Sequence, residues 1–179
     1  LVALVFDSRD SYAEFARAEV GEAARSMIGY YSLQSNPMIM YDLTGVEELK
    51  RGGDRGTSAR INQILSQPRA ERTVATIVHE ATHQLAFNSG LQVRYADIPF
   101  WVSEGIAIYF ESPDLSSSKG WRTIGGINRV NLANFRKFVR SRPADALETL
   151  LADDKRFRDA ATAADAYAEA WARRYFLFQ

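Results

Sequence analysis

The first part of the chain carries short apolar runs of the kind that form strands. Residues 1–6 (LVALVF) are apolar and partly β-branched, and the turn-forming pair Asp-Ser follows them, which predicts a buried strand. Apolar residues at helical spacing predict a helix over about residues 10–24. Two further apolar runs, 27–33 and 38–43, flank the turn residues 34–37, and this arrangement predicts a β-hairpin.

The second part of the chain carries the longer periodicity of helices. A helix is expected over about residues 69–88, and a second one is expected from Pro99 to about Glu111. The segments 45–60 and 112–126 are polar and glycine-bearing, which predicts loops, and the rest of the chain is mostly helical in pattern.

The order of these elements, strands first and helices second, predicts an α+β protein with a small, mostly antiparallel sheet packed on helices. A length of 179 residues suits one domain. We therefore expect residues 1–179 to form a single domain, with a sheet-bearing part over 1–90 and a helical part over 91–179. The abrupt start within a strand suggests a domain excised from a longer chain.

Composition and charge narrow the candidate chemistry. The 22 basic and 22 acidic side chains balance, so we expect no general attraction to nucleic acid or to anionic membranes. Cysteine is absent, which restricts any metal site to His, Asp and Glu ligands. No apolar run is long enough to span a bilayer, and no signal peptide is visible. These features do not identify the cellular compartment, and we expect an extracytoplasmic location.

The only two histidines of the chain lie in one H-E-x-x-H motif, made by His79, Glu80 and His83. On a helix, residues four apart lie on the same face, so both imidazoles can reach one ion. Glu80 points about 100° around the helix, where it can bind a metal-held water and act as general base. Zinc accepts neutral imidazoles and activates water and carbonyl groups. The alternative is that both histidines are ordinary surface or core residues.

A third ligand is needed, because a catalytic zinc usually has three protein ligands and one open position. The pattern HExxHxxGxxH is absent, since Ala86 and Ser89 replace its glycine and last histidine. Glu104 is the best remaining candidate, because it lies in the apolar segment 99–111, where an unpaired carboxylate is costly to bury. A solvated face or an ion pair is the alternative. Glu111 can orient a ligand histidine or lie on a solvated helix end.

The stretches HEATHQL (79–85) and WVSEGIA (101–107) resemble the gluzincin branch of the zincin metallopeptidases, within the peptidase MA-like families. They are most similar to an uncharacterised bacterial domain family, and the stretches GYYS and MIMYDLTG extend the resemblance over most of the chain. The resemblance implies a thermolysin-like core in a zincin-like catalytic domain. It also implies His79, His83 and Glu104 as zinc ligands, with Glu80 as general base.

Two further positions follow from this resemblance. Related families place a tyrosine near the C-terminal helix that stabilises the oxyanion, and Tyr167 in YAEAWARRYF matches that place. Core packing at helical spacing is the alternative for Tyr167. The resemblance fails at Ile108, where thermolysin has an aspartate that supports a ligand histidine, so a different group must orient the histidine here.

The sequence therefore predicts a zinc metallopeptidase that cleaves a peptide or protein substrate. The alternatives are an inactive zinc-bound binding or scaffold module, a hydrolase of a non-protein amide or cell-wall peptide, and a metal-free helical interaction domain. The strand over 38–43 can be the sheet edge that pairs with substrate, or an interior strand. The basic segment 51–60 can guide an acidic substrate or be merely solvated.

Overall fold

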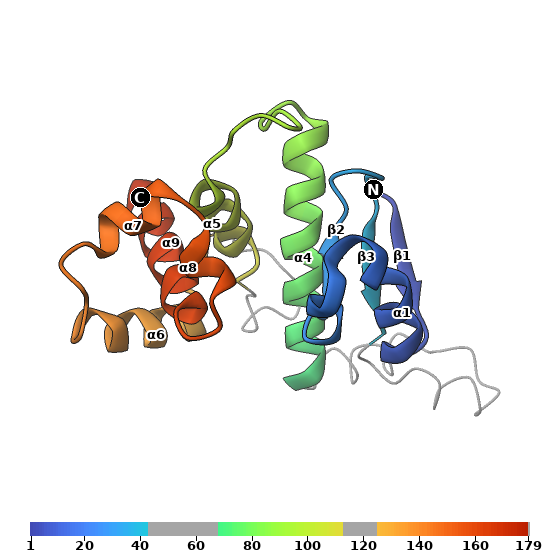
Figure 1. Cartoon of the computed structure of the whole chain (residues 1–179), viewed down its shortest axis with the longest axis horizontal. Coiled ribbons are helices and arrows are strands. Elements are labelled where there is room, and N and C mark those ends of the chain that lie inside the picture. Colours follow the sequence, from blue (N-terminus) through green and yellow to red (C-terminus); the bar gives the residue numbers. More distant parts are fainter. Residues whose placement is uncertain (43–67, 113–124, 179) are drawn as a thin grey trace. The chain divides into compact units, whose positions relative to one another are not determined.

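The computed structural model describes residues 1–42, 68–112 and 125–178 (Figure 1). Its contacts divide the chain into two compact units, Leu1–Asn88 and Ser89–Gln179. The basic segment 51–60 and most of the two predicted loops lie outside the described residues, and the expectation of a single domain stays a prediction.

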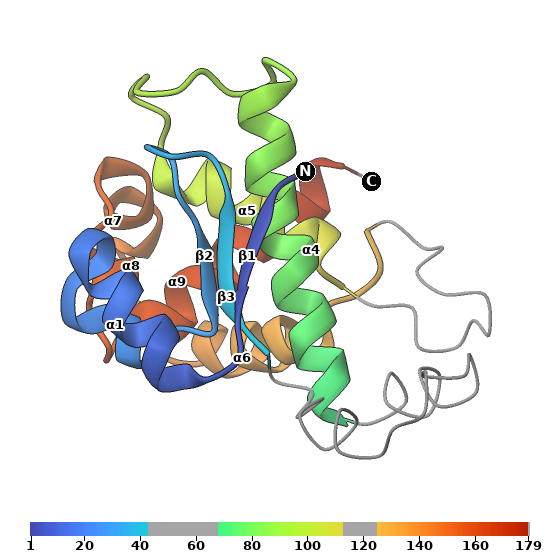
Figure 2. The same ribbon diagram turned by 90° about the vertical axis from the view of Figure 1, so that its right-hand side faces the viewer.

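The first unit is built on a three-stranded sheet. It contains the strands β1 (Ala3–Phe6), β2 (Gly29–Tyr31) and β3 (Met38–Tyr41), and β3 lies between the other two (Figure 2). The expected hairpin is confirmed, because β2 and β3 are antiparallel. The expectation of a mostly antiparallel sheet is wrong, because β1 pairs with β3 in parallel. A helix between β1 and the hairpin returns the chain to the end of the sheet at which β1 starts, and two parallel strands need such a crossover.

Two other expectations about these strands are also corrected. The strand over residues 1–6 is largely exposed rather than buried, because β1 is paired on one side only among the described strands. The strand over residues 38–43 is an interior strand rather than a free edge, since β3 pairs with a neighbour on each side.

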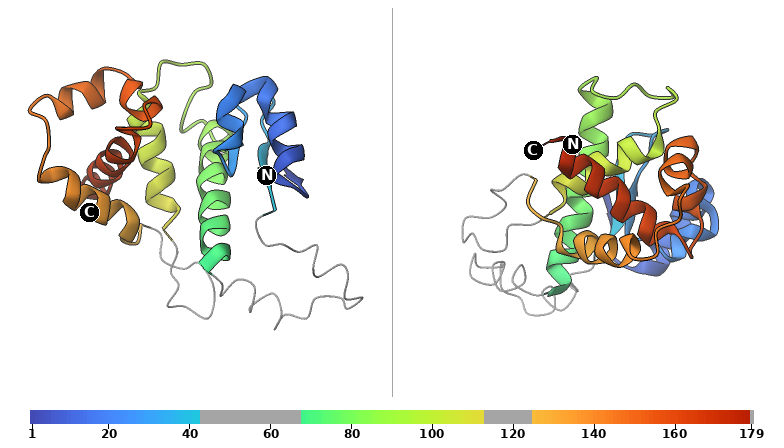
Figure 3. Two further views of the ribbon diagram at one scale, coloured as in Figure 1. Left: turned by 60° about the horizontal axis from the view of Figure 1, so that its bottom comes forward. Right: turned by 90° about the vertical axis from the view of Figure 1, so that its left-hand side faces the viewer.

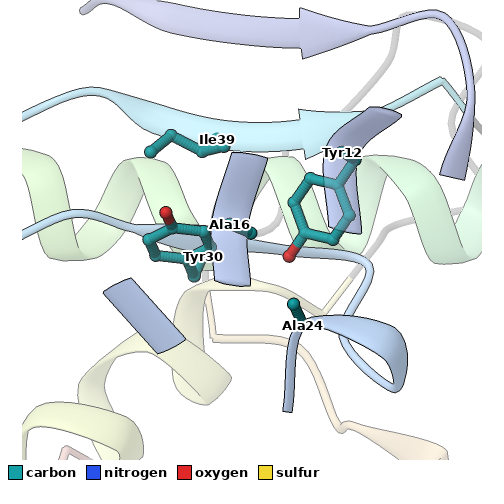
Figure 4. Close-up of a cluster of buried hydrophobic side chains, with 5 residues drawn as sticks. All are labelled: Tyr12, Ala16, Ala24, Tyr30 and Ile39. Carbon is teal, nitrogen blue, oxygen red and sulfur yellow. The ribbon is translucent and has the colours of Figure 1, made fainter. Parts of the chain in front are cut away.

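Helices cover both faces of the sheet. The helix α1 (Arg9–Val20) and the short helix η1 (Gly21–Arg25) lie on one face, and the long helix α4 (Pro68–Asn88) lies on the other (Figures 1 and 3). The core between α1 and the sheet gathers apolar and aromatic side chains, drawn in Figure 4: Tyr12, Ala16, Ala24, Tyr30 and Ile39. Burial of these side chains stabilises the unit.

Polar contacts fasten α4 to the sheet. The side-chain amide of Gln84, which is 2% exposed, donates to the carbonyl oxygens of Val2 and Asn36. Asn36 has a left-handed φ of 79° in the turn before β3, and its own side-chain oxygen accepts from Asn88 and from Tyr31. The last two turns of α4 are therefore held in one register against the sheet.

The second unit is helical, as the sequence predicts. It contains α5 (Phe100–Phe110), α6 (Arg129–Val139), α7 (Ala146–Ala152), α8 (Lys155–Arg158) and α9 (Ala163–Leu177). The helix α9 packs against α5, α6 and α8, as Figure 3 shows. Its core gathers Leu150, Phe157, Ala166 and Ala170, with Trp101 and Tyr167 packed against them.

The secondary structure is thus α+β, with a small mixed sheet in one unit and helices in the other. Within the three described ranges, no helix has the length and apolar character that a membrane crossing requires.

Candidate metal centre

The two histidines of the motif converge on one side of α4. They lie one helical turn apart, and their Nε2 atoms are 3.2 Å from each other. The rings meet edge to face, with centroids 4.9 Å apart and planes inclined by 75°. His83 is buried and His79 is half-buried. A well-formed helix therefore brings two ring nitrogens to one point.

The separation of these nitrogens fits two ligands of one tetrahedral ion. Zn–N bonds of about 2.0–2.1 Å at a tetrahedral angle give nitrogens about 3.3 Å apart. A hydrogen bond between two neutral imidazoles has a similar length. The distance is therefore compatible with a shared metal ion and with a shared proton.

Glu80 lies on the face of α4 that meets the sheet. Gln84, four residues later and on the same face, reaches the carbonyl oxygens of Val2 and Asn36. Glu80 is 9% exposed. Burial, followed by the nearby Glu80 charge, raises the pKa of Tyr12 to about 12. Glu80 is therefore a buried carboxylate on the motif helix, close enough to Tyr12 for its charge to act on the tyrosine.

Glu104 is buried in the middle of α5, with an exposed fraction of 8%. The solvated-face alternative for Glu104 is therefore wrong. The next residue, Gly105, allows α5 and α9 to approach closely, because a β-carbon at Gly105 would lie 3.1 Å from the carbonyl oxygen of Ala170. The expected beginning of the helix at Pro99 is confirmed, since Pro99 caps α5.

By chemistry, His79, His83 and Glu104 form a donor set that could hold a metal ion. Two imidazoles and one carboxylate suit a divalent cation of borderline softness. The role of Glu80 as a base stays a prediction.

The remaining predicted residues lie in the second unit. The Tyr167 ring is half-buried and packs edge to face on Phe157, with centroids 5.1 Å apart. Core packing of Tyr167 is therefore observed, and its catalytic role stays a prediction. Glu111 accepts a hydrogen bond of 2.9 Å from the side chain of Asn128. Ile108, at the place of the missing aspartate, is buried in α5.

Three features near these residues were missed by sequence reasoning. Gln84 fastens the Glu80 face of α4 to the sheet, Gly105 sets the approach of α9, and Asn128 both caps α6 and binds Glu111. The sequence carried a signal for the role of Gly105, because a glycine inside an apolar helix often marks close packing against a neighbouring element.

A comparison with protein-family models matches residues 73–179 to a family described as "Protein of unknown function (DUF1570)". The match covers more than half of the chain, so the chain belongs to this family. The matched range contains every candidate site residue named above. No curated protein and no solved structure matches the chain.

Proposed function

We propose that the chain is a zinc-dependent metallopeptidase of gluzincin type, with His79, His83 and Glu104 as zinc ligands and Glu80 as general base. The observation that carries the proposal is the 3.2 Å approach of the two Nε2 atoms on α4, close to the spacing of two ligands on one tetrahedral zinc. The buried carboxylate of Glu104 adds a third ligand of a type that catalytic zinc accepts.

The proposed chemistry is hydrolysis of a peptide bond in a peptide or protein substrate. Zinc, when bound, supplies a Lewis acid for the carbonyl group and for water. Glu80 accepts the proton of the attacking water and then donates it to the leaving amine. Its low exposure supports this role, because water exclusion strengthens the interaction of a carboxylate with a nearby proton donor.

The histidines belong to the first unit and Glu104 belongs to the second, so the proposal needs separate tests of the two kinds of ligand. Tyr167 remains a candidate for stabilising the oxyanion, and its hydroxyl is the group to vary after the ligands.

Metal analysis of the purified chain tests the ligand set. We expect one zinc per chain in the wild type, and a loss of at least ten-fold in zinc affinity in both His79→Ala and Glu104→Ala. His79 is the more exposed histidine, so its variant is expected to fold, which circular dichroism checks. Zinc bound as tightly by Glu104→Ala as by the wild type would remove Glu104 from the site.

Peptide-library cleavage, read by mass spectrometry in zinc-containing buffer, tests the activity. The variant Glu80→Gln should keep zinc and lose at least 100-fold in rate, because the base is gone while the ligands remain. A wild type that binds zinc and cleaves no peptide would favour the inactive binding module over the enzyme.

A further inference from the structure

A cluster of opposite charges around one buried carboxylate lies in the second unit. The carboxylate of Glu169 on α9 has a side-chain exposure of 2% and pairs with three arginines. Its oxygen Oε1 accepts from Arg142 at 3.2 Å and from Arg173 at 2.8 Å, and Oε2 accepts from Arg156 at 3.0 Å.

The cluster carries more positive than negative charge. Within the described ranges, Glu169 is the carboxylate with which these arginines pair. Asp153 and Asp154, the acids that precede Arg156 in the sequence, pair with Lys155 and Arg158. Three guanidinium groups therefore face one carboxylate, which leaves two positive charges at a partly buried position, where uncompensated charge is costly.

Two of the three arginine side chains are partly exposed to solvent. The side chains of Arg142 and Arg173 are 39% and 28% exposed, whereas Arg156 is 14% exposed. Arg156 is also fixed from two sides, because it donates to the carbonyl oxygen of Ala146 and lies over the Phe138 ring. The Nη2 atoms of Arg142 and Arg173 donate to the same oxygen of Glu169, at 3.2 Å and 2.8 Å, so the two guanidinium groups are neighbours around one atom.

Each guanidinium has five N–H donors, and in Arg142 and Arg173 only one terminal nitrogen is engaged by Glu169. Donors on two adjacent arginines match the oxygens of a phosphate group. The two uncompensated charges match the charge of a phosphate near pH 7, which is about −1.5 to −2. A singly charged carboxylate would neutralise only part of the cluster.

We propose that Arg142 and Arg173, positioned by Glu169, form a binding site for a phosphate group, supplied by free phosphate or by a phosphate ester. None of these residues is a proposed zinc ligand, so the site does not depend on the proposed zinc site. Its ligand neutralises the cluster and stabilises the part of the chain between α6 and α9.

Calorimetric titration of the full chain with inorganic phosphate, in EDTA and at constant ionic strength, tests the site. We expect one phosphate per chain and at least a ten-fold weaker affinity in Arg142→Gln. The control Arg140→Gln removes an exposed arginine two residues earlier and should bind as the wild type does. Phenyl phosphate in a parallel titration separates the sources, because tighter binding than inorganic phosphate indicates an ester.

Unfolding temperatures give a second measurement on the same variants. Phosphate should raise the unfolding temperature of the wild type and of Arg140→Gln above that in sodium chloride of equal ionic strength, and Arg142→Gln should lose this shift. No binding by the wild type, or equal binding by Arg142→Gln and the wild type, would overturn the proposal. The zinc proposal stands or falls separately, because EDTA removes the metal from this experiment.

Discussion

The side-chain nitrogen of Gln84 donates a hydrogen bond of 3.1 Å to the carbonyl oxygen of Val2, across 82 positions of sequence. This contact joins the motif-bearing helix α4 to the chain just before β1. Because Glu80 lies one turn earlier on the same helix, the same contact holds in place the part of α4 that carries the proposed base.

Gln84→Ala should therefore destabilise the first unit. Two hydrogen bonds are lost, to the carbonyl oxygens of Val2 and Asn36, although the Val2 oxygen still accepts from the backbone N–H of Met38. At about 1 kcal/mol for each bond, the expected loss is about 2 kcal/mol in free energy of unfolding. Urea unfolding followed by circular dichroism measures it. Leu85→Ala is the matched control, because Leu85 is 53% exposed on the same helix and should change stability by less than about 0.5 kcal/mol. Equal effects of both variants would contradict this account of Gln84.

Removal of the metal should lower the unfolding temperature if the zinc proposal holds. A ligand at 100 times its Kd stabilises a folded protein by about 2.7 kcal/mol, which corresponds to roughly 5–10 °C for a chain of this size. Scanning fluorimetry with and without EDTA measures the shift. Glu80→Gln should keep it, whereas His83→Ala should show none, and a chelator effect that survives in His83→Ala would point to a different site.

Tyr12→Phe should flatten the loss of stability at alkaline pH. Burial and the Glu80 charge raise the pKa of Tyr12 to about 12 from 10.0, so the folded chain holds this proton more tightly than the unfolded chain. The resulting stabilisation, about 3 kcal/mol, is complete below pH 10 and is lost as the pH rises towards 12. Urea unfolding at pH 9 and at pH 11.5 measures the difference.

The same variant gives an internal check near neutral pH. The Tyr12 hydroxyl is buried and has no hydrogen-bond partner among the described residues. Removing an unsatisfied buried hydroxyl is neutral or stabilising, so Tyr12→Phe should be at least as stable as the wild type at pH 7. A wild-type pH profile that Tyr12→Phe leaves unchanged would contradict the assignment of the alkaline loss to Tyr12. Tyr30, whose pKa is also raised by burial, should still cause part of the loss of stability at alkaline pH in the Tyr12→Phe variant.

Gly105→Ala should destabilise the second unit although alanine is the better helix former. Propensity alone favours the substitution by about 1 kcal/mol. The new β-carbon would lie 3.1 Å from the Ala170 carbonyl oxygen, and the resulting displacement of α9 is expected to cost about 1–3 kcal/mol. Thermal unfolding shows whether the substitution lowers or raises the unfolding temperature. A raised unfolding temperature would show that α9 can move away from α5 without a loss of stability.

Glu169→Gln should be among the most destabilising single changes in the chain. The substitution leaves three arginines around a neutral amide, and breaking a buried ion pair in this way costs about 3–5 kcal/mol. Glu148→Gln, at an exposed position of α7, is the control and should be nearly neutral. Chemical denaturation of both variants measures the difference, and a small effect of Glu169→Gln would mean that the arginines find other partners.

The sequence by itself determined those features that depend on residues close together in the chain. The spacing of His79 and His83 was enough, because a helix fixes the direction of residues four apart. The turn chemistry of residues 34–37 was enough for the β2–β3 hairpin, since its strands are neighbours in sequence.

Tertiary structure alone decided the features that join distant parts of the chain. The parallel pairing of β1 with β3, and the exposure of β1, depend on where α1 returns the chain. No local sequence pattern specifies that position. The roles of Gln84 and Glu169 also depended on distant partners. Hydrophobic periodicity identifies which side of an element is buried, but the partner that covers it is chosen by the packing of the whole unit.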